Sequence, residues 1–226
     1  ERSRGLGDVY KRQLGNSVTL TSGTGNLTLW SDYDNNSSGA FNAGTSVSLT
    51  TNGGKVTIAG GADTGASTVE TGRVSGDLLP DGYAWGTSAN LTGVYFNSSL
   101  AVNSNGGDVF IAGHGYSGSS TVETGISFQP GAQVLTGAGK IHIYGVSSGT
   151  GTTSNAWSEG IRISGTTSDG LRGTKFINSN TSPDAIVVTG DASATTQGRS
   201  AGILAISWYN ITGGGINIVI ANTSSG

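Results

Sequence analysis

Residues 51–60 read Thr51-Asn-Gly-Gly-Lys-Val-Thr-Ile-Ala-Gly60, and residues 105–113 read Asn105-Gly-Gly-Asp-Val-Phe-Ile-Ala-Gly113. The two stretches are 53 residues apart. The same offset relates Ser67-Thr-Val-Glu-Thr-Gly72 to Ser120-Thr-Val-Glu-Thr-Gly125. A Gly-Gly turn followed by a short strand with apolar residues two apart is therefore a repeat unit, and such repeats indicate a repetitive architecture.

The composition favours many short strands. Of the 226 residues, 40 are Gly and 3 are Pro, and charged residues make up 11%, against about 25% in an average soluble domain. Aliphatic residues recur two apart with Gly, Asn, Ser and Thr between them, which is typical of strands joined by tight turns. The low net charge and the apolar content exclude a disordered composition. The sequence predicts an all-β protein.

Several classes of function are excluded by composition. The chain has no Cys, which excludes disulfides and thiolate metal sites. A formal net charge of −3 and the lack of a basic cluster within the repeats argue against a nucleic-acid partner. No apolar run approaches the roughly 20 residues of a membrane span. We predict no cofactor.

The first residues differ from the rest of the chain. Residues 1–13 contain four of the eleven Lys and Arg residues and show no strand period. Residues 8–13, Asp-Val-Tyr-Lys-Arg-Gln, resemble the translation of a transposon end used for sequencing libraries. We interpret 1–13 as an artefact of this kind, with a genuine basic linker as the alternative, and exclude it from fold reasoning. Residues 14–226 are expected to be one repeat segment, truncated at both ends.

The apolar residues recur with a fixed spacing. Three pairs are nine residues apart: Val18 and Leu27, Val47 and Val56, and Leu100 and Val109. Later strands are expected around residues 140–143, 160–163, 202–206 and 215–220. Because alternate residues of a strand face opposite sides, we expect one aliphatic, buried face and one chemically mixed face in contact with water.

A solenoid accounts for this spacing. In such a fold, strands and tight corners form a coil, and the next coil stacks on it at about 4.8 Å. Gly or Asn supplies the left-handed backbone that the corners need. We predict a single-stranded, right-handed parallel β-helix with about 20–25 residues per coil. Residues 61–68 and 146–158 are expected to be corner loops, and tandem antiparallel sandwiches are the alternative fold.

Residues 38–61, Ser-Gly-Ala-Phe-Asn-Ala-Gly-Thr-Ser-Val-Ser-Leu-Thr-Thr-Asn-Gly-Gly-Lys-Val-Thr-Ile-Ala-Gly-Gly, resemble the filamentous haemagglutinin-like exoproteins of bacterial two-partner secretion. Residues 155–165, Asn-Ala-Trp-Ser-Glu-Gly-Ile-Arg-Ile-Ser-Gly, and 91–96, Leu-Thr-Gly-Val-Tyr-Phe, are similar to another recurrent unit of that family. The resemblance covers nearly everything after Gln13. It implies a right-handed β-helical shaft of a large secreted or surface-exposed adhesin, exported by an outer-membrane transporter.

The function expected from this resemblance is structural and adhesive, without catalysis. A host-cell or matrix glycan or protein would be the receptor in cell adhesion, and its identity is not readable. The amino-terminal secretion domain of the family is not recognisable, so we interpret the chain as an internal segment. The alternative is a carbohydrate-active β-helix enzyme or a polysaccharide-binding module, which needs charged groups that converge on one face of adjacent coils.

One loop has the spacing of a metal site. Asp32, Asp34 and Asn36 alternate in Asp-Tyr-Asp-Asn-Asn-Ser-Ser-Gly, and oxygen ligands in this pattern suit calcium. Ser37 stands where an EF-hand loop has Gly, and no bidentate Glu follows. The favoured alternative is a polar corner whose Asx side chains cap their own turn, so calcium is only a weak candidate and we assign no metal.

Two histidines receive no catalytic role. Gly113-His114-Gly115 is similar to the Gly-His-Gly of pectin-degrading β-helix hydrolases, but the acidic motifs and the Arg-Ile-Lys of those enzymes are missing. His142 lies between Ile141 and Ile143 and is expected to face solvent.

Carboxylates and aromatic residues near the repeats are also expected to be structural. Glu70 and Glu123 occupy matching places in two repeats, whereas an active site is normally unique. Residues 76–86 break the repeat and contain Asp77, Asp81, Tyr83 and Trp85. A protruding loop there could stack a sugar on its rings, but we favour aromatic residues that cover the shaft.

Overall fold

A computed structural model describes residues 12–62, 80–118, 122–150, 157–164, 173–195, 199–206, 209–212 and 216–222. Every regular element in these ranges is a β-strand, which confirms the all-β prediction. Nothing in the described part of the chain forms a helix of the length and apolarity that crossing a membrane requires.

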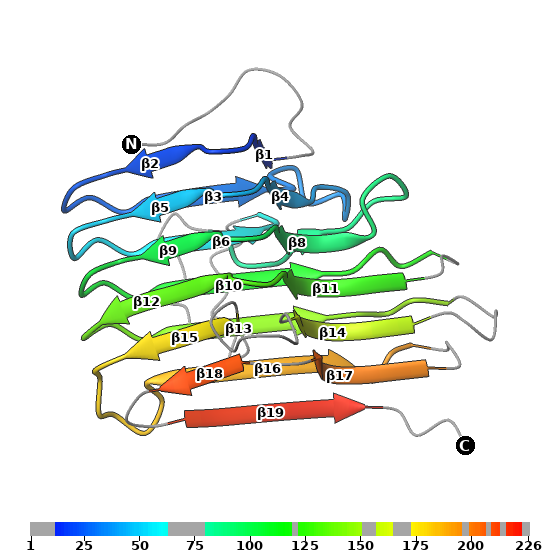
Figure 1. Ribbon diagram of the computed structural model, residues 1–226. Helices are drawn as coiled ribbons and strands as arrows, with labels where there is room; N and C mark the ends of the chain where they lie inside the picture. Colours follow the sequence, from blue (N-terminus) through cyan, green and yellow to red (C-terminus); the bar gives the residue numbers. More distant parts are fainter. Residues whose placement is uncertain are drawn as a thin grey trace.

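The strands form three parallel sheets, and within each sheet the strands are stacked along one common axis (Figure 1). Sheet A contains β1 (Arg12–Leu14), β4 (Phe41–Ala43), β8 (Thr92–Phe96), β11 (Val122–Phe128), β14 (Trp157–Ser164) and β17 (Arg199–Ile206). Sheet B contains β2 (Thr19–Thr21), β5 (Ser48–Thr50), β9 (Ala101–Asn103), β12 (Gln133–Gly137), β15 (Thr174–Asn178) and β18 (Tyr209–Thr212). Sheet C contains β3 (Leu27–Ser31), β6 (Val56–Gly60), β10 (Val109–His114), β13 (Ile141–Val146), β16 (Ile186–Ala192) and β19 (Ile216–Asn222), and β7 (Ala84–Trp85) pairs with β10.

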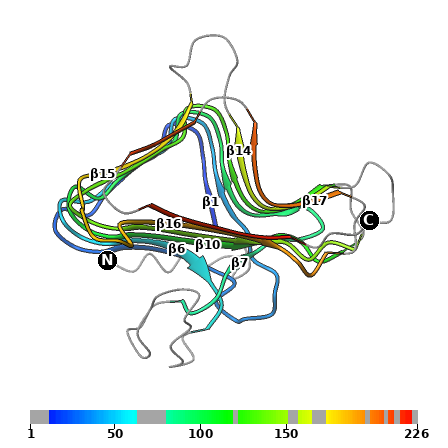
Figure 2. The ribbon, with the colours of Figure 1, turned by 90° about the horizontal axis from the view of Figure 1, so that it is seen from below.

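The chain visits the three sheets in turn and then begins the next layer. Each strand pairs in parallel with the strand of its own sheet in the following layer, as β4 does with β8 and β8 with β11. We call one set of three strands a rung. Seen along the axis, the rungs superpose around a triangular interior (Figure 2). This arrangement is consistent with a β-solenoid.

The rungs are longer than predicted, and the predicted coil length of about 20–25 residues is wrong. The Lys55 backbone N–H donates across one rung to Asn26, with a sequence separation of 29. The Lys140 backbone N–H donates in the same way to Asp108, with a separation of 32. The nine-residue spacing leads only from sheet B to sheet C, and each rung has a third strand in sheet A with a different pattern. Strands β6 and β10 pair across a still longer stretch, because the segment that contains β7 is inserted between β6 and β8.

The aliphatic residues face the interior, as predicted. Val56, Val109 and Ile141 are in register in sheet C, and at most 1% of each side chain is exposed. Sheet A supplies Ile161 and Ile163, which pair with Ile126 and Phe128 of β11. Each fully buried side chain of this size contributes about 1.5–3 kcal/mol to the stability of the fold. Together these residues form one continuous apolar core.

A ladder of phenylalanines connects the rungs within this core. The ring centroids of Phe41 and Phe96 are 5.9 Å apart, and Phe128 lies 5.0 Å from both Phe96 and Phe176. All four rings are buried. Aromatic pairs at such distances are worth about 0.5–1.5 kcal/mol beyond their buried area. The ladder therefore links four consecutive rungs energetically.

Glycines close the core where sheet A bends to meet the end of sheet C (Figure 2). A Cβ atom on Gly145 would collide with the carbonyl oxygen of Gly160, and one on Gly190 with that of Gly202. Backbone therefore packs directly on backbone at this edge. Only Gly allows an approach this close.

The mixed face of the strands does not meet water throughout. Every residue of β6 and β10 is buried, so the expected solvent-facing side is wrong for Thr57 and Phe110. Phe110 belongs to a second apolar cluster with Ala59 and Ala112, against which Tyr83 and Tyr144 pack. The inserted segment contributes to this burial, because its Tyr83 packs against the cluster and its β7 pairs with β10 (Figure 2).

Two predicted boundaries lie close to observed strand ends. Strand β1 begins at Arg12, two residues before the expected start of the repeat segment, and Arg12 Nη2 donates to the carbonyl oxygen of Trp30 at 3.1 Å. Residues 1–11 lie outside the described residues, so their origin as a sequencing artefact stays a prediction. Within the expected loop 146–158, residues 147–150 contain no strand and β14 begins at Trp157. Residues 151–156 and 63–68 of the two expected loops are not among those described.

Candidate functional site

The outer face of sheet A is concave, because its strands curve as they lead from the end of sheet C towards sheet B (Figure 2). In a parallel sheet, residues in register point to the same side. One outward row consists of Asn42, Tyr95, Ser127 and Arg162. A second row, before the bend, consists of Thr92, Thr124 and Glu159. We call these two rows, together with Asn90 and Leu91, the sheet A groove. Ser127, Thr124 and Glu159 are buried within it.

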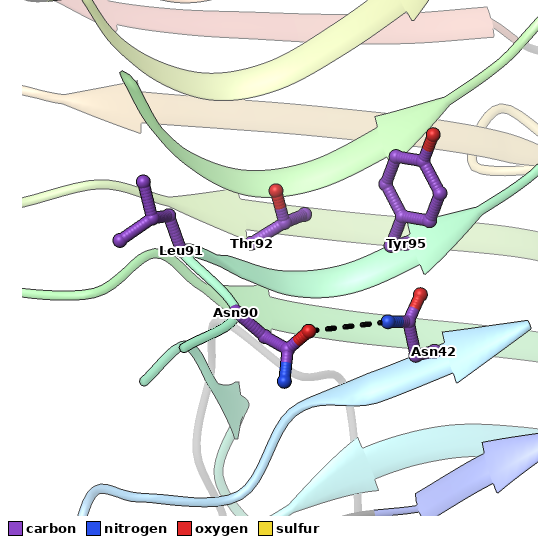
Figure 3. A pocket seen from close by; sticks show the side chains of 5 residues that line it. All are labelled: Asn42, Asn90, Leu91, Thr92 and Tyr95. Carbon is purple, nitrogen blue, oxygen red and sulfur yellow. Dashed lines mark hydrogen bonds between the residues drawn. The ribbon is translucent and has the colours of Figure 1, made fainter. Parts of the chain in front are cut away.

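Beside β4 and β8 the groove contains a depression of about 210 Å³, lined by Asn42, Asn90, Leu91, Thr92 and Tyr95 (Figure 3). Asn42 Nδ2 donates to Asn90 Oδ1 at 3.3 Å. A tight turn holds Asn90, whose backbone N–H donates to both the carbonyl oxygen and the hydroxyl of Thr87. The lining side chains are neutral, and most carry hydroxyl or amide groups.

Further along the groove, Glu159 forms a buried ion pair. Its Oε1 accepts a hydrogen bond from Arg162 Nη2 at 2.9 Å, and its Oε2 accepts one from Thr124 Oγ1 at 2.9 Å. The Glu159 side chain is completely buried. Burial raises the pKa of Glu159, and the charge of Arg162 and the two hydrogen bonds oppose this shift.

Glu159 was not among the residues predicted from the sequence. In a regular strand, residues three apart face opposite sides, so the segment Glu-Gly-Ile-Arg offered no reason to pair Glu159 with Arg162. The pairing of β11 with β14 passes from Thr124–Glu159 directly to Ile126–Ile161, and the irregularity at Gly160 brings both charges to one side. A Gly between opposite charges in a strand is the signal that could have revealed the pair.

The candidate calcium residues form a self-capped loop. The Asp32 carboxylate accepts hydrogen bonds from the backbone N–H groups of Asn36, Ser37 and Ser38 at 3.1–3.3 Å. Asn36 Nδ2 donates to Asp34 Oδ2 at 2.9 Å. Burial raises the pKa of Asp32, against the effect of these N–H groups. The geometry is that of Asx capping, the interpretation favoured from the sequence, and calcium at the three residues remains an untested weak candidate.

The histidines lie apart from the sheet A groove. His114 is 7% exposed, and its ring stacks on Trp85 with centroids 3.6 Å apart. Its Nδ1 lies 2.6 Å from the Gly115 carbonyl oxygen, and burial lowers its pKa. His142 is half-buried rather than solvated, with Nε2 3.2 Å from the Asp184 carbonyl oxygen. Trp85 thus packs against the end of β10, in agreement with the interpretation that the aromatic residues of this segment cover the strands.

The duplicated and inserted carboxylates are only partly described. Glu123 is completely buried in β11, and Asp81 is 6% exposed. Glu70 and Asp77 lie outside the described residues, so the predicted equivalence of Glu70 and Glu123 stays untested. Among the residues that the structure describes, no three His, Asp or Glu side chains are grouped so that they could hold a metal ion.

Comparison of the chain with protein-family models, with curated proteins and with solved structures found no match.

Proposed function

We propose that this chain is a structural and adhesive shaft segment of a large secreted or surface-exposed bacterial filament, with no catalysis of its own. The observation that carries this proposal is the continuity of the core. Successive rungs are joined by parallel strand pairs in all three sheets, and the phenylalanine ladder passes through four of them. A protein built in this way can be lengthened by adding rungs.

The energetics favour such a role. In a stacked repeat protein, stability is approximately a sum of rung and interface contributions, so a long rod stays stable without disulfides or metals. Parallel crossover connections are right-handed in about 98% of cases. We therefore propose that the chain forms a single-stranded, right-handed β-helix, the geometry that the resemblance of residues 38–61 also implies.

Export and location follow from the same resemblance. We propose passage through an outer-membrane transporter of the two-partner type and a final place in the medium or at the cell surface. There the shaft would hold a binding region away from the cell, and a glycan or protein of a host cell or matrix would be the receptor.

A carbohydrate-active enzyme is the alternative, and buried Glu159 is the observation that favours it. Glycosidases generally place two carboxyl groups on either side of the scissile bond. The Glu159 carboxylate already accepts hydrogen bonds from Arg162 and Thr124. We therefore favour a structural role for this pair. A turnover assay on polysaccharides with wild type and Glu159→Gln separates the two proposals: activity that Glu159→Gln abolishes would support the enzyme.

The shaft proposal is tested by grafting. The chain is inserted behind the secretion domain of a filamentous haemagglutinin-like exoprotein that is expressed with its transporter. We expect a secreted rod in electron micrographs, lengthened by about 4.8 Å for each rung. Retention inside the cell, or a compact particle at the rod's end, would overturn the proposal. The matched control carries Gly145→Val, which blocks the contact between sheets A and C and should prevent the lengthening.

A further inference from the structure

We propose that the sheet A groove binds a neutral oligosaccharide, with one sugar ring seated in the depression beside Tyr95. This site goes beyond the shaft function. It also stands independently of that function, because it rests on the side chains of β4, β8 and the turn before β8 rather than on the continuity of the core.

The polar groups of the depression suit hydroxyl-rich ligands. Asn42 and Asn90 share one hydrogen bond of 3.3 Å through Asn42 Nδ2 and Asn90 Oδ1. The Oδ1 atom of Asn42 and the Nδ2 atom of Asn90 point away from that bond (Figure 3). A side-chain amide both donates and accepts hydrogen bonds, and the Thr92 hydroxyl adds another donor and acceptor. Together they match the paired hydroxyl groups on the rim of a sugar ring.

The apolar groups suit the other side of the same ligand. Tyr95 is half-buried and lines one side of the depression, and Leu91 lines the opposite side of the depression (Figure 3). A pyranose ring has an apolar C–H face and a polar rim, and aromatic rings with a polar tip bind such amphipathic surfaces. An aromatic ring among amides and hydroxyls therefore favours a sugar over a purely apolar ligand.

The charge of the groove selects neutral chains. The side chains that line the depression include no Asp, Glu, Lys, Arg or His. Along the groove, Arg162 is paired with Glu159. Nucleic acids and sulfated glycans bind through unpaired Lys and Arg, which the described part of the groove does not offer.

A peptide is disfavoured by the sheet itself. Strand β8 pairs with β4 on one side and with β11 on the other, so the groove has no free strand edge to which a peptide could add. Drug-sized ligands fill pockets of about 300–1,000 Å³. A depression of about 210 Å³ instead suits a single sugar residue of an oligosaccharide.

The experiment is a glycan array probed with the purified chain, followed by calorimetry with the best neutral oligomer. The array carries oligomers of glucose, mannose, galactose and N-acetylglucosamine, and also heparin fragments and unrelated peptides. We expect binding to at least one neutral series, weakened at least tenfold by Tyr95→Ala and by Asn42→Ala/Asn90→Ala. Tyr95→Phe should retain binding, because it keeps the ring. Tyr33→Ala is the matched control, since Tyr33 is a 52% exposed tyrosine outside the groove.

Circular dichroism verifies that each variant keeps the fold, which is expected because the changed side chains face outward. Binding to no neutral series at millimolar concentration would overturn the site. So would a preference for heparin or peptides, or equal losses for Tyr95→Ala and Tyr33→Ala. None of these results would affect rod formation, so failure of this site and failure of the shaft proposal are distinguishable.

Discussion

Glu159 and Arg162 are three residues apart in one strand, yet their side chains meet on the same side of sheet A, with 2.9 Å between Oε1 and Nη2. Regular strand geometry does not allow this contact. It arises at Gly160, where sheet A turns against sheet C. The bend that closes the core thus also creates a buried charge on the concave outer face.

The ion pair predicts a strong asymmetry between single and double variants. Arg162→Leu leaves Glu159 buried without its cation, which should cost about 3–5 kcal/mol of unfolding free energy at neutral pH. Glu159→Gln/Arg162→Leu should cost clearly less, because no charge remains buried. Urea unfolding measures both. The control is Lys55→Ala, since the Lys55–Asp108 pair at 3.7 Å is about half exposed and should contribute less than about 1 kcal/mol.

The raised pKa of Glu159 predicts that the stability of the fold depends on pH. Because the folded state holds the proton more tightly than the unfolded state, this group's contribution to stability is complete below its unfolded pKa and is lost as pH rises through the folded pKa. The melting temperature should therefore fall more steeply between acid and neutral pH for wild type than for Glu159→Gln. Parallel curves for the two proteins would contradict this assignment.

His114 predicts the opposite slope. Burial lowers its pKa below the ordinary value of 6.5, so the unfolded state binds the proton more tightly and stability falls as pH decreases from 6.5 towards the folded pKa. Protonation would also place a positive charge on the buried His114 ring that stacks on Trp85. His114→Gln should flatten the melting temperature between pH 7 and 5, which calorimetry measures. An unchanged slope would show that other groups control this range.

The glycine contact between sheets A and C predicts a large steric effect. Gly145→Ala places a methyl group against the carbonyl oxygen of Gly160, and the loss should exceed about 4 kcal/mol, as for other severe steric changes. Gly15→Ala is the control, because no atom lies within 4 Å of a Cβ at Gly15. It should leave stability unchanged or slightly raised. Chemical denaturation of both variants gives the comparison.

The hydrogen bonds of Asp32 should hold its loop in place without a bound metal. Asp32→Ala removes the acceptor of three backbone N–H groups and should cost about 1–3 kcal/mol. Asp32→Asn should cost less, because Asn also caps turns and tolerates the positive φ of 48° at this position. We expect millimolar calcium to leave the wild-type melting temperature unchanged. A clear rise that Asp32→Ala abolishes would instead establish the calcium site.

The strand pattern of sheets B and C was readable because every second residue there is aliphatic and the turns repeat. Val47 and Val56 show this spacing clearly. Sheet A was harder to read, since its strands bend at Gly and carry buried polar side chains, such as Thr124 and Glu159, before the bend. The burial of the outer face of β10 was not predictable either, because Tyr83, which packs against the cluster that contains Phe110, belongs to an insertion that breaks the repeat.

The candidate groove was similarly hidden from sequence. Asn42 and Asn90 are 48 residues apart, and no sequence pattern relates one to the other. Their contact depends on the pairing of β4 with β8 across the inserted segment. Asp32, Asp34 and Asn36 were found because their spacing is local. A local pattern, however, does not distinguish a metal site from a loop whose side chains cap their own backbone.

The central claim is that successive rungs stack in parallel register, and introduced cysteines test it most directly because the chain has none. Ser48 pairs with Ala101, and Ala101 pairs with Gln133, on the outside of sheet B. Neighbouring strands are about 4.8 Å apart, within the range that a disulfide spans. Mild oxidation should cross-link Ser48→Cys/Ala101→Cys and Ala101→Cys/Gln133→Cys, and should leave Ser48→Cys/Gln133→Cys, two rungs apart, reduced. Cross-linking of the last pair, or of neither of the first two, would contradict the account.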